Sequence, residues 1–242
     1  MEVTLAVATA AQRSLSKQLE TVANNIANAN TVGFRSEAVD FNTLVSTADK
    51  VPVHFPNITG VHASSMQGTH IETGNPYDLA ISGDGFFAIQ TPAGTAYTRD
   101  GRLQVTPFGD LQTIEGYPVL DSGNAPIQIT DTSVKPTISP DGRILTDGNF
   151  VGEIGVYSVN QEDVVSRYGN SAFFTKTPAE PIAPGSRTTI TQGSVESSNV
   201  NAMKELANMI TIQQHFEAAS SIIEKANETI KGAVTELSTR KG

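Results

Sequence analysis

Apolar residues in the first 26 positions of the chain recur at alternating steps of three and four residues. That spacing keeps one narrow stripe on a single side of an α-helix for about three heptads. Only Gln12 interrupts its apolar character. We predict an N-terminal helix within residues 1–33, and its stripe is formed by Leu5, Ala8, Gln12, Leu15, Leu19, Val22 and Ile26.

The C-terminal part of the chain repeats this three-and-four spacing without interruption. Ser and Asn residues within 197–201 can cap the start of a helix, and no Pro or Gly follows before Gly232. A helix over 202–238 would be about 55 Å long. Large residues alternate with alanines along its stripe, which suits close approach of two helices; the positions are Met209, Ile212, Phe216, Ala219, Ile223, Ala226, Ile230, Ala233 and Leu237.

Two such stripes at opposite ends of one chain favour pairing of the terminal helices as a coiled coil. The alternative is that each helix is an ordinary core helix of a compact domain. We expect residues 1–33 and 196–242 to form one inner coiled-coil domain. Its seam is predicted to consist of Leu5, Leu15, Leu19, Val22, Ile26, Met209, Ile212, Phe216, Ile223, Ile230 and Leu237.

The pattern between the helices is that of short β-strands. Runs such as Gly85–Gln90 are apolar, and Arg102–Val105 and Gly152–Tyr157 alternate. Asp-Gly dipeptides at 84, 100, 141 and 147 suit tight hairpin turns, because both residues tolerate positive φ. We predict a central antiparallel all-β domain over 71–195, joined to the first helix by an extended connecting arm over 34–70. The expected fold class is therefore α+β.

Composition and charge exclude several classes of function. The chain of 242 residues has no Cys, which excludes disulfides, thiolate metal sites and a cysteine nucleophile. Its net charge of -9, of which residues 31–195 hold about -8, argues against binding to nucleic acid or to an anionic membrane. No run is long and apolar enough for direct membrane insertion, and the first residues do not resemble a cleaved signal peptide.

Few residues of the sequence indicate a catalytic or metal-binding site. The four histidines, His54, His62, His70 and His215, do not show the spacing of a metal site. Gly83-Asp84-Gly85 lacks the rest of a phosphate loop or calcium loop, and a hairpin turn is the better interpretation. We expect no catalytic, cofactor-binding or metal-binding residues, although the acidic β domain leaves open an exported enzyme that acts on cell-wall glycan.

The stretch Asn24-Asn25-Ile26-Ala27-Asn28-Ala29-Asn30 is unusual for a helix end. Asn is a poor residue for a helix interior, so three of them within about one turn need a compensating role. Asn24, Asn25 and Asn28 fall away from the seam and would form a polar face able to pair with neighbouring helices. Asn30 and Gly33 can adopt positive φ and turn the chain out of the helix.

Residues 24–35, NNIANANTVGFR, closely resemble the N-terminal signature of bacterial flagellar rod and hook proteins. Further segments of that family resemble three other parts of the chain and follow in the same order: Gly83–Phe87, Tyr97–Gly101 and Val195–Asn201. The resemblance implies an assembly motif consisting of Asn24, Asn25, Asn28, Gly33, Phe34, Asn199 and Asn201.

The resemblance also implies a function. Such proteins are structural subunits of a helical tube that transmits torque and encloses the export channel. The implied partners are copies of the chain, other rod proteins and the flagellar type III export apparatus. The implied location is the rod of the flagellar basal body in the periplasmic space, reached without a cleaved signal peptide.

Within the family, the length of the β domain excludes a hook subunit and the shortest rod subunits. The arm lacks a long Gly- and Gln-rich stretch, so the chain resembles a proximal rod subunit more than the distal one. A distal rod protein or another axial subunit remains the alternative, and an exported adhesin is a third hypothesis.

Overall fold

The computed structural model describes residues 2–48, 51–130, 134–160, 163–183 and 187–239. A helix lies at each end of the chain, and antiparallel β-structure lies between them, which confirms the predicted α+β class. The chain forms two compact units. We call them the helical unit, residues 1–27, 37–62 and 201–242, and the β unit, residues 28–36 and 63–200.

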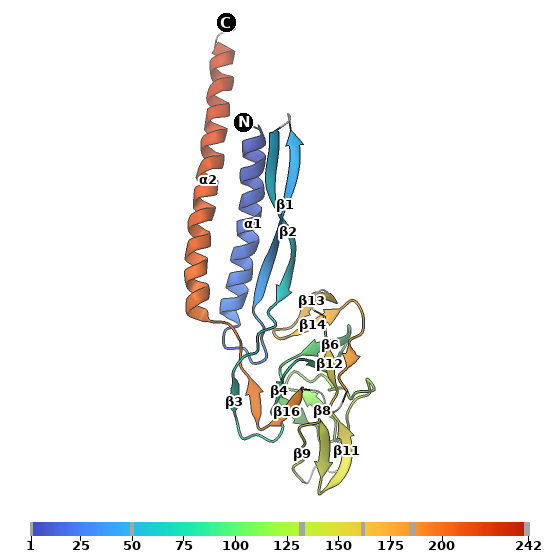
Figure 1. Ribbon diagram of the computed structural model, residues 1–242. Helices are drawn as coiled ribbons and strands as arrows, with labels where there is room; N and C mark the ends of the chain where they lie inside the picture. Colours follow the sequence, from blue (N-terminus) through green and yellow to red (C-terminus); the bar gives the residue numbers. More distant parts are fainter. Residues whose placement is uncertain (1, 49–50, 131–133, 161–162, 184–186, 240–242) are drawn as a thin grey trace. The chain divides into compact units, whose positions relative to one another are not determined.

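The first helix, α1 (Glu2–Ala27), lies between the second helix and a two-stranded sheet (Figure 1). Of the predicted seam residues, Val22 is buried and Leu5, Leu15, Leu19 and Ile26 are half-buried. Ser14, Thr21 and Asn25 are buried as well, so α1 is covered over more than its seam. The residues after Ala27 form turns that belong to the β unit.

The second helix, α2 (Ala202–Thr239), begins at a capping asparagine. The Asn201 Oδ1 atom accepts a hydrogen bond from the Lys204 amide at 3.1 Å, and Glu205 adds a carboxylate to the first turn, where the helix dipole favours it. Met209, Ile212, Phe216, Ile223 and Ile230 are half-buried, whereas the side chain of Leu237 lies outside the described residues. The rest of the described surface of α2 is mostly exposed.

Two long strands, β1 (Glu37–Ala48) and β2 (Val51–Ala63), pair with each other and complete the helical unit. They lie within the segment for which the sequence predicts an extended arm. Pro52 and Pro56 fit this arrangement because both strands of a two-stranded sheet are edge strands, where proline is tolerated.

The β unit contains a six-stranded sheet in the order β13-β14-β6-β5-β12-β15 and several smaller sheets, and its strand pairs are antiparallel. The described strands are β3 (His70–Glu72), β4 (Leu79–Ser82), β5 (Phe86–Thr91), β6 (Gly94–Thr98), β7 (Leu103–Val105), β8 (Leu111–Thr113), β9 (Thr137–Ile138), β10 (Arg143–Thr146), β11 (Asn149–Glu153), β12 (Val156–Ser158), β13 (Val164–Tyr168), β14 (Ala172–Thr175), β15 (Glu180–Pro181), β16 (Thr189–Gln192) and β17 (Ser194–Glu196).

The Asp-Gly dipeptides have two different roles. Asp147 and Gly148 have φ values of 52° and 78° and join the paired strands β10 and β11, as a two-residue hairpin requires. Asp141-Gly142 lies between the paired strands β9 and β10. The hairpin predicted at Gly83-Asp84-Gly85 is wrong, because this turn joins β4 and β5, which lie in different sheets. The same holds for Asp100-Gly101, between β6 and β7.

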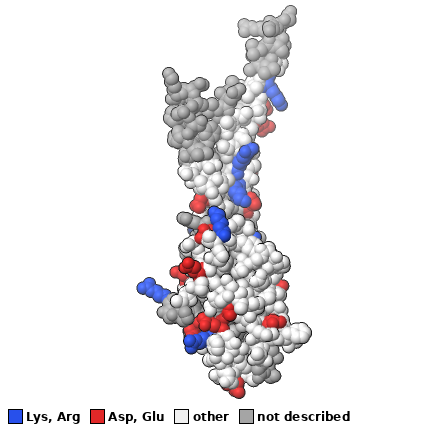
Figure 2. All heavy atoms as spheres, turned by 90° about the vertical axis from the view of Figure 1, so that its right-hand side faces the viewer, with Lys and Arg blue, Asp and Glu red and all other residues white. Residues whose placement is uncertain are grey.

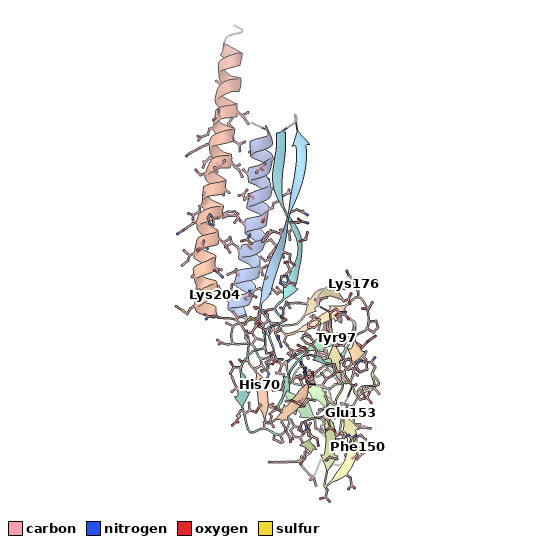
Figure 3. All side chains as sticks on the ribbon, viewed as in Figure 1. His70, Tyr97, Phe150, Glu153, Lys176 and Lys204 are labelled. Atoms are coloured by element: carbon pink, nitrogen blue, oxygen red, sulfur yellow. The ribbon has the colours of Figure 1, made fainter. Side chains whose placement is uncertain are left out.

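The interior of the β unit is apolar on both sides of β5. Phe87 and Ile89 point into a large core cluster, whereas Ala88 points into a smaller one with Tyr97, Tyr157 and Phe173. Burial on both faces explains why β5 reads as a continuous apolar run rather than an alternating one. Tyr97 is labelled within this unit in Figure 3, and its hydroxyl oxygen accepts a hydrogen bond from the Ala179 amide at 2.9 Å.

Candidate functional site

The segment that follows α1 makes a sharp corner at Gly33. Its φ of +70° lies in the left-handed region, and a Cβ atom at this position would lie 2.3 Å from the Asp100 backbone nitrogen. The Gly33 amide donates a hydrogen bond to the Glu196 carbonyl at 2.8 Å. A glycine is required here by both the backbone conformation and the space.

Phe34 anchors this corner in the β unit. Its side chain is 1% exposed, and the Arg167 guanidinium carbon lies 4.4 Å from its ring centroid. The Arg167 Nη2 atom also donates a hydrogen bond to the Arg35 carbonyl at 2.6 Å. The cation over the ring and the hydrogen bond together hold residues 34 and 35 against β13.

Next to Phe34 lies a buried cluster of three charged side chains, which we call the ion triad: Arg35, Arg99 and Glu196. Glu196 is fully buried, with its Oε1 atom 3.0 Å from Arg35 Nη2 and its Oε2 atom 2.8 Å from Arg99 Nη1. The Gly68 amide donates a further hydrogen bond to Oε1 at 3.0 Å. One carboxylate thus joins two guanidinium groups and a backbone amide.

The two arginines also bind backbone carbonyl groups. Arg35 Nη1 donates to the Ser65 carbonyl at 2.8 Å, and Arg99 donates to Ile81 at 3.1 Å and to Gly83 at 2.7 Å. Burial lowers the pKa of Arg35 and of Arg99 below the ordinary guanidinium value, and the Glu196 charge opposes that shift. Without Glu196, two buried cations would face each other, and such an unpaired buried charge costs about 3–5 kcal/mol.

Asn199 fastens the same corner from the C-terminal side. Its Oδ1 atom accepts a hydrogen bond from the Ser36 amide at 2.7 Å, and its Nδ2 atom donates to the Met66 carbonyl at 2.8 Å. The structure therefore brings together three of the predicted assembly residues, Gly33, Phe34 and Asn199, around the ion triad.

The asparagines of α1 lie in the helical unit. Asn25 is 2% exposed, its Nδ2 atom donates to the Glu37 carbonyl at 2.9 Å, and its Oδ1 atom accepts from the Glu37 amide at 2.8 Å. We call this pair of bonds the Asn25 clamp. Asn24 donates to the Glu37 carboxylate at 3.3 Å.

Two more of the predicted residues have local partners. Asn28 accepts a hydrogen bond from the Thr31 hydroxyl at 3.1 Å, and Asn201 caps α2. The assembly role of these residues stays a prediction, and the clamp gives Asn25 an intrachain role that the sequence did not indicate.

The sequence reasoning missed the ion triad, although Arg35, Arg99 and Glu196 each lie within a segment that resembles the flagellar family. The available signal was that each of three resembling segments contains one of these charged residues. Among the residues that the structure describes, no group of His, Asp and Glu side chains could hold a metal ion, and none of the described helices is long and apolar enough to cross a membrane.

Three family models match separate parts of the chain: "Flagella basal body rod protein" over residues 5–35, "Flagellar hook protein FlgE/F/G D1 domain" over 80–146, and "Flagellar basal body rod FlgEFG protein C-terminal" over 191–235. Each member of the ion triad lies in a different one of these segments: Arg35 in the first, Arg99 in the second and Glu196 in the third. The triad is thus a point at which residues of all three segments meet.

Similar curated proteins cover nearly the whole chain. The flagellar basal-body rod protein FlgF of Mesorhizobium japonicum is 40% identical over 240 residues, which are 99% of this chain and 100% of the relative. FlgF of Rhizobium meliloti is 37% identical, with 98% of both chains covered. The rod protein FlgG of Bacillus subtilis is 31% identical over 92% of this chain and 94% of its own.

Proposed function

This chain belongs to the family of flagellar basal-body rod and hook proteins, and we propose that it is a structural subunit of the proximal rod, of the FlgF type. The observation that carries the proposal is the near full-length match to proteins named FlgF, at 37–40% identity. FlgG proteins match at lower identity, so a distal rod subunit is the second candidate. These relatives are structural proteins, which supports a function without catalysis.

Pairing of α1 and α2 as a coiled coil is part of the proposal. Its support is that the described seam residues are half-buried or buried, and that Gln12, the polar residue of the α1 stripe, donates a hydrogen bond to the Ser220 hydroxyl of α2 at 3.2 Å. A polar pair at one level of an apolar seam fixes the register of two helices. We propose that this pair of helices forms the inner layer of the tube.

The ion triad would then serve force transmission. It ties the segment that follows α1 to the segment that precedes α2 and to the β unit, through ion pairs of 2.8–3.0 Å in a dry environment. Torque passed along either helix must cross residues 28–36 or 196–200. A rigid, buried connection at both would resist bending of these segments.

The location of the chain and its division into segments belong to the same proposal. We propose four segments, 1–33, 34–70, 71–195 and 196–242, and assembly with copies of the chain and with other rod proteins. Export by the flagellar type III apparatus without a cleaved signal peptide would place the chain in the periplasmic rod.

Deletion of the coding sequence tests this function. The expected result is loss of swimming and loss of filaments, both restored by the full-length chain expressed from a plasmid. The restored chain should copurify with detergent-extracted basal bodies and resist removal by salt. A deletion strain that swims normally, or a chain absent from the basal-body fraction, would contradict the proposal.

A further inference from the structure

The helical unit exposes a short apolar stripe at the start of α2. Met203, Leu206 and Ile210 are 77%, 42% and 57% exposed, and their spacing of three and four residues places them on one side of the helix. The seam that contacts α1 lies on another side. We call these three residues the outer stripe; Lys204, in the same turn, is labelled in Figure 3.

The same unit contains a groove of about 390 Å³ between α1, β1 and α2. Val22, Val39, Phe41 and Ile212 give it an apolar lining, and Phe41 is 44% exposed. The remaining lining residues are Gln18, Thr21, Glu37, Ala38, Glu205, Asn208 and Thr211. We call it the side groove.

The outer stripe and the side groove lie at the same height of α2 but on opposite sides of it. At about 100° per residue, the centre of the lining positions 205, 208, 211 and 212 is roughly half a turn from the centre of positions 203, 206 and 210. A chain therefore cannot fill its own groove with its own stripe. If one copy inserts its stripe into the groove of the next, its own groove stays free for a third copy, and such a head-to-tail contact builds a ring or a helical filament.

Charge favours a second copy of this chain as the occupant. The helical unit carries eight basic and ten acidic residues, whereas the β unit carries eight basic and fifteen acidic ones. In Figure 2, acidic side chains gather over the β unit. Copies therefore repel each other least where their helical units meet, and an apolar contact there removes two exposed hydrophobic surfaces from water.

We propose that the outer stripe of one copy docks into the side groove of the next, and that this contact joins copies of the chain laterally. The inference rests on the proposed function, since it describes how a rod subunit contacts its own kind. Leu206 would be the central side chain of the contact, with Met203 and Ile210 above and below it.

Disulfide cross-linking tests this contact, because the chain has no cysteine of its own. The full-length chain carrying both Leu206→Cys and Phe41→Cys replaces the natural one, and purified basal bodies are oxidised and separated without reductant. Phe41 belongs to β1 and lines the groove, whereas Leu206 lies on the side of α2 that faces away from the groove, so a disulfide between them would join two copies. The expected result is a ladder of dimers and higher oligomers of this chain, absent from either single variant.

Two matched pairs serve as controls. Ile222→Cys with Phe41→Cys uses another exposed apolar position of α2, which is 52% exposed but lies off the stripe. Thr9→Cys with Leu206→Cys tests a second groove, which is lined by α1 and β2 residues. Both pairs should give no ladder.

The outcomes separate the contact from the function. A chain in the basal-body fraction that gives no ladder, an equal ladder with a control pair, or a cross-link to a different protein would overturn the contact and leave the proposed function standing. A chain missing from that fraction, with cysteines or without, would overturn the function and the contact together.

Discussion

The β unit and the helical unit differ in how completely each buries its own apolar side chains. In the β unit, Phe87, Ile144 and Val119 are fully buried inside core clusters, although Phe108 and Phe150 are 84% and 62% exposed at its surface. In the helical unit, the described seam residues other than Val22 stay half-buried, and Met203 is 77% exposed. The β unit therefore contains buried apolar clusters of its own, whereas the described part of the helical unit buries only Ala8 and Val22 among its apolar side chains and leaves most of its apolar stripe available for contacts outside the chain.

This contrast can be measured because the two units give separate signals. All five tyrosines, Tyr77, Tyr97, Tyr117, Tyr157 and Tyr168, lie in the β unit, and the chain has no Trp. Tyrosine fluorescence thus follows unfolding of the β unit, whereas helical circular dichroism follows α1 and α2.

The largest expected effect is that of Glu196→Gln in the β unit. The neutral amide leaves Arg35 and Arg99 without their buried counter-charge, so the free energy of unfolding should fall by about 3–5 kcal/mol. Urea unfolding followed by tyrosine fluorescence measures this loss. Glu180→Gln, at an exposed position of β15, is the matched control. A midpoint equal to that of the control would show that the triad does not stabilise the unit.

A smaller effect is expected for Asn25→Ala in the helical unit. The change removes both bonds of the Asn25 clamp and leaves the Glu37 backbone groups without these partners, which costs about 1–3 kcal/mol. Amide hydrogen exchange of β1 and β2 should quicken, while tyrosine fluorescence unfolding should not change. Asn30→Ala, at an exposed position, should alter neither signal. Unchanged exchange in β1 would contradict the role of the clamp.

The loss of one buried hydroxyl in the β unit should matter less. The Tyr157 hydroxyl lies within hydrogen-bond distance of two acceptors, the Asp121 carbonyl and Asn124 Oδ1, and has one hydrogen to donate to them, so Tyr157→Phe should cost about 1 kcal/mol at neutral pH. Tyr77→Phe, at a half-buried position, is the matched control for loss of a hydroxyl.

The same residue gives a pH dependence. Burial raises the pKa of the Tyr157 phenol above its ordinary value of 10.0. Because the folded pKa is the higher one, its contribution to stability is complete below the unfolded pKa and is lost as pH rises toward the folded pKa. The stability of Tyr157→Phe should therefore fall less between about pH 9 and pH 11 than that of the natural chain. Parallel curves for the two chains would refute this.

The elements of the fold could be predicted because their signals are local. The three-and-four spacing of Leu15, Leu19 and Val22 indicates a helix without reference to any other part of the chain. In the same way, β5 begins directly after Gly85 and ends directly before Pro92. The pairing of β1 with β2 was harder to predict, because Pro52 and Pro56 argue against a central strand, and only the finding that both strands are edges explains them.

The candidate site could be predicted only in part. A turn at Gly33 and a buried anchor at Phe34 could be predicted from the residue types alone, because glycine adopts positive φ and phenylalanine is large and apolar. Arg35, Arg99 and Glu196 are distant in the sequence. The residues around each of them do not indicate which oppositely charged side chain it will pair with. The Asn25 clamp was missed for a related reason: an asparagine on a helix gives no sign of whether its amide will bind the same chain or another.

The smallest effect on the β unit, and the largest on assembly, is expected for the seam. Leu19 is half-buried in the helical unit, so Leu19→Asp should shift tyrosine-monitored unfolding of the β unit by no more than about 0.5 kcal/mol. An aspartate in the seam would bury a charge when the two helices pack, so helical circular dichroism and swimming should both be lost. Ile223→Asp should act in the same way from α2, and Ser16→Asp, at an exposed position of α1, should preserve swimming. Normal motility of either seam variant would rule out the coiled coil, whereas loss of the β-unit signal would show that the two units do not fold independently.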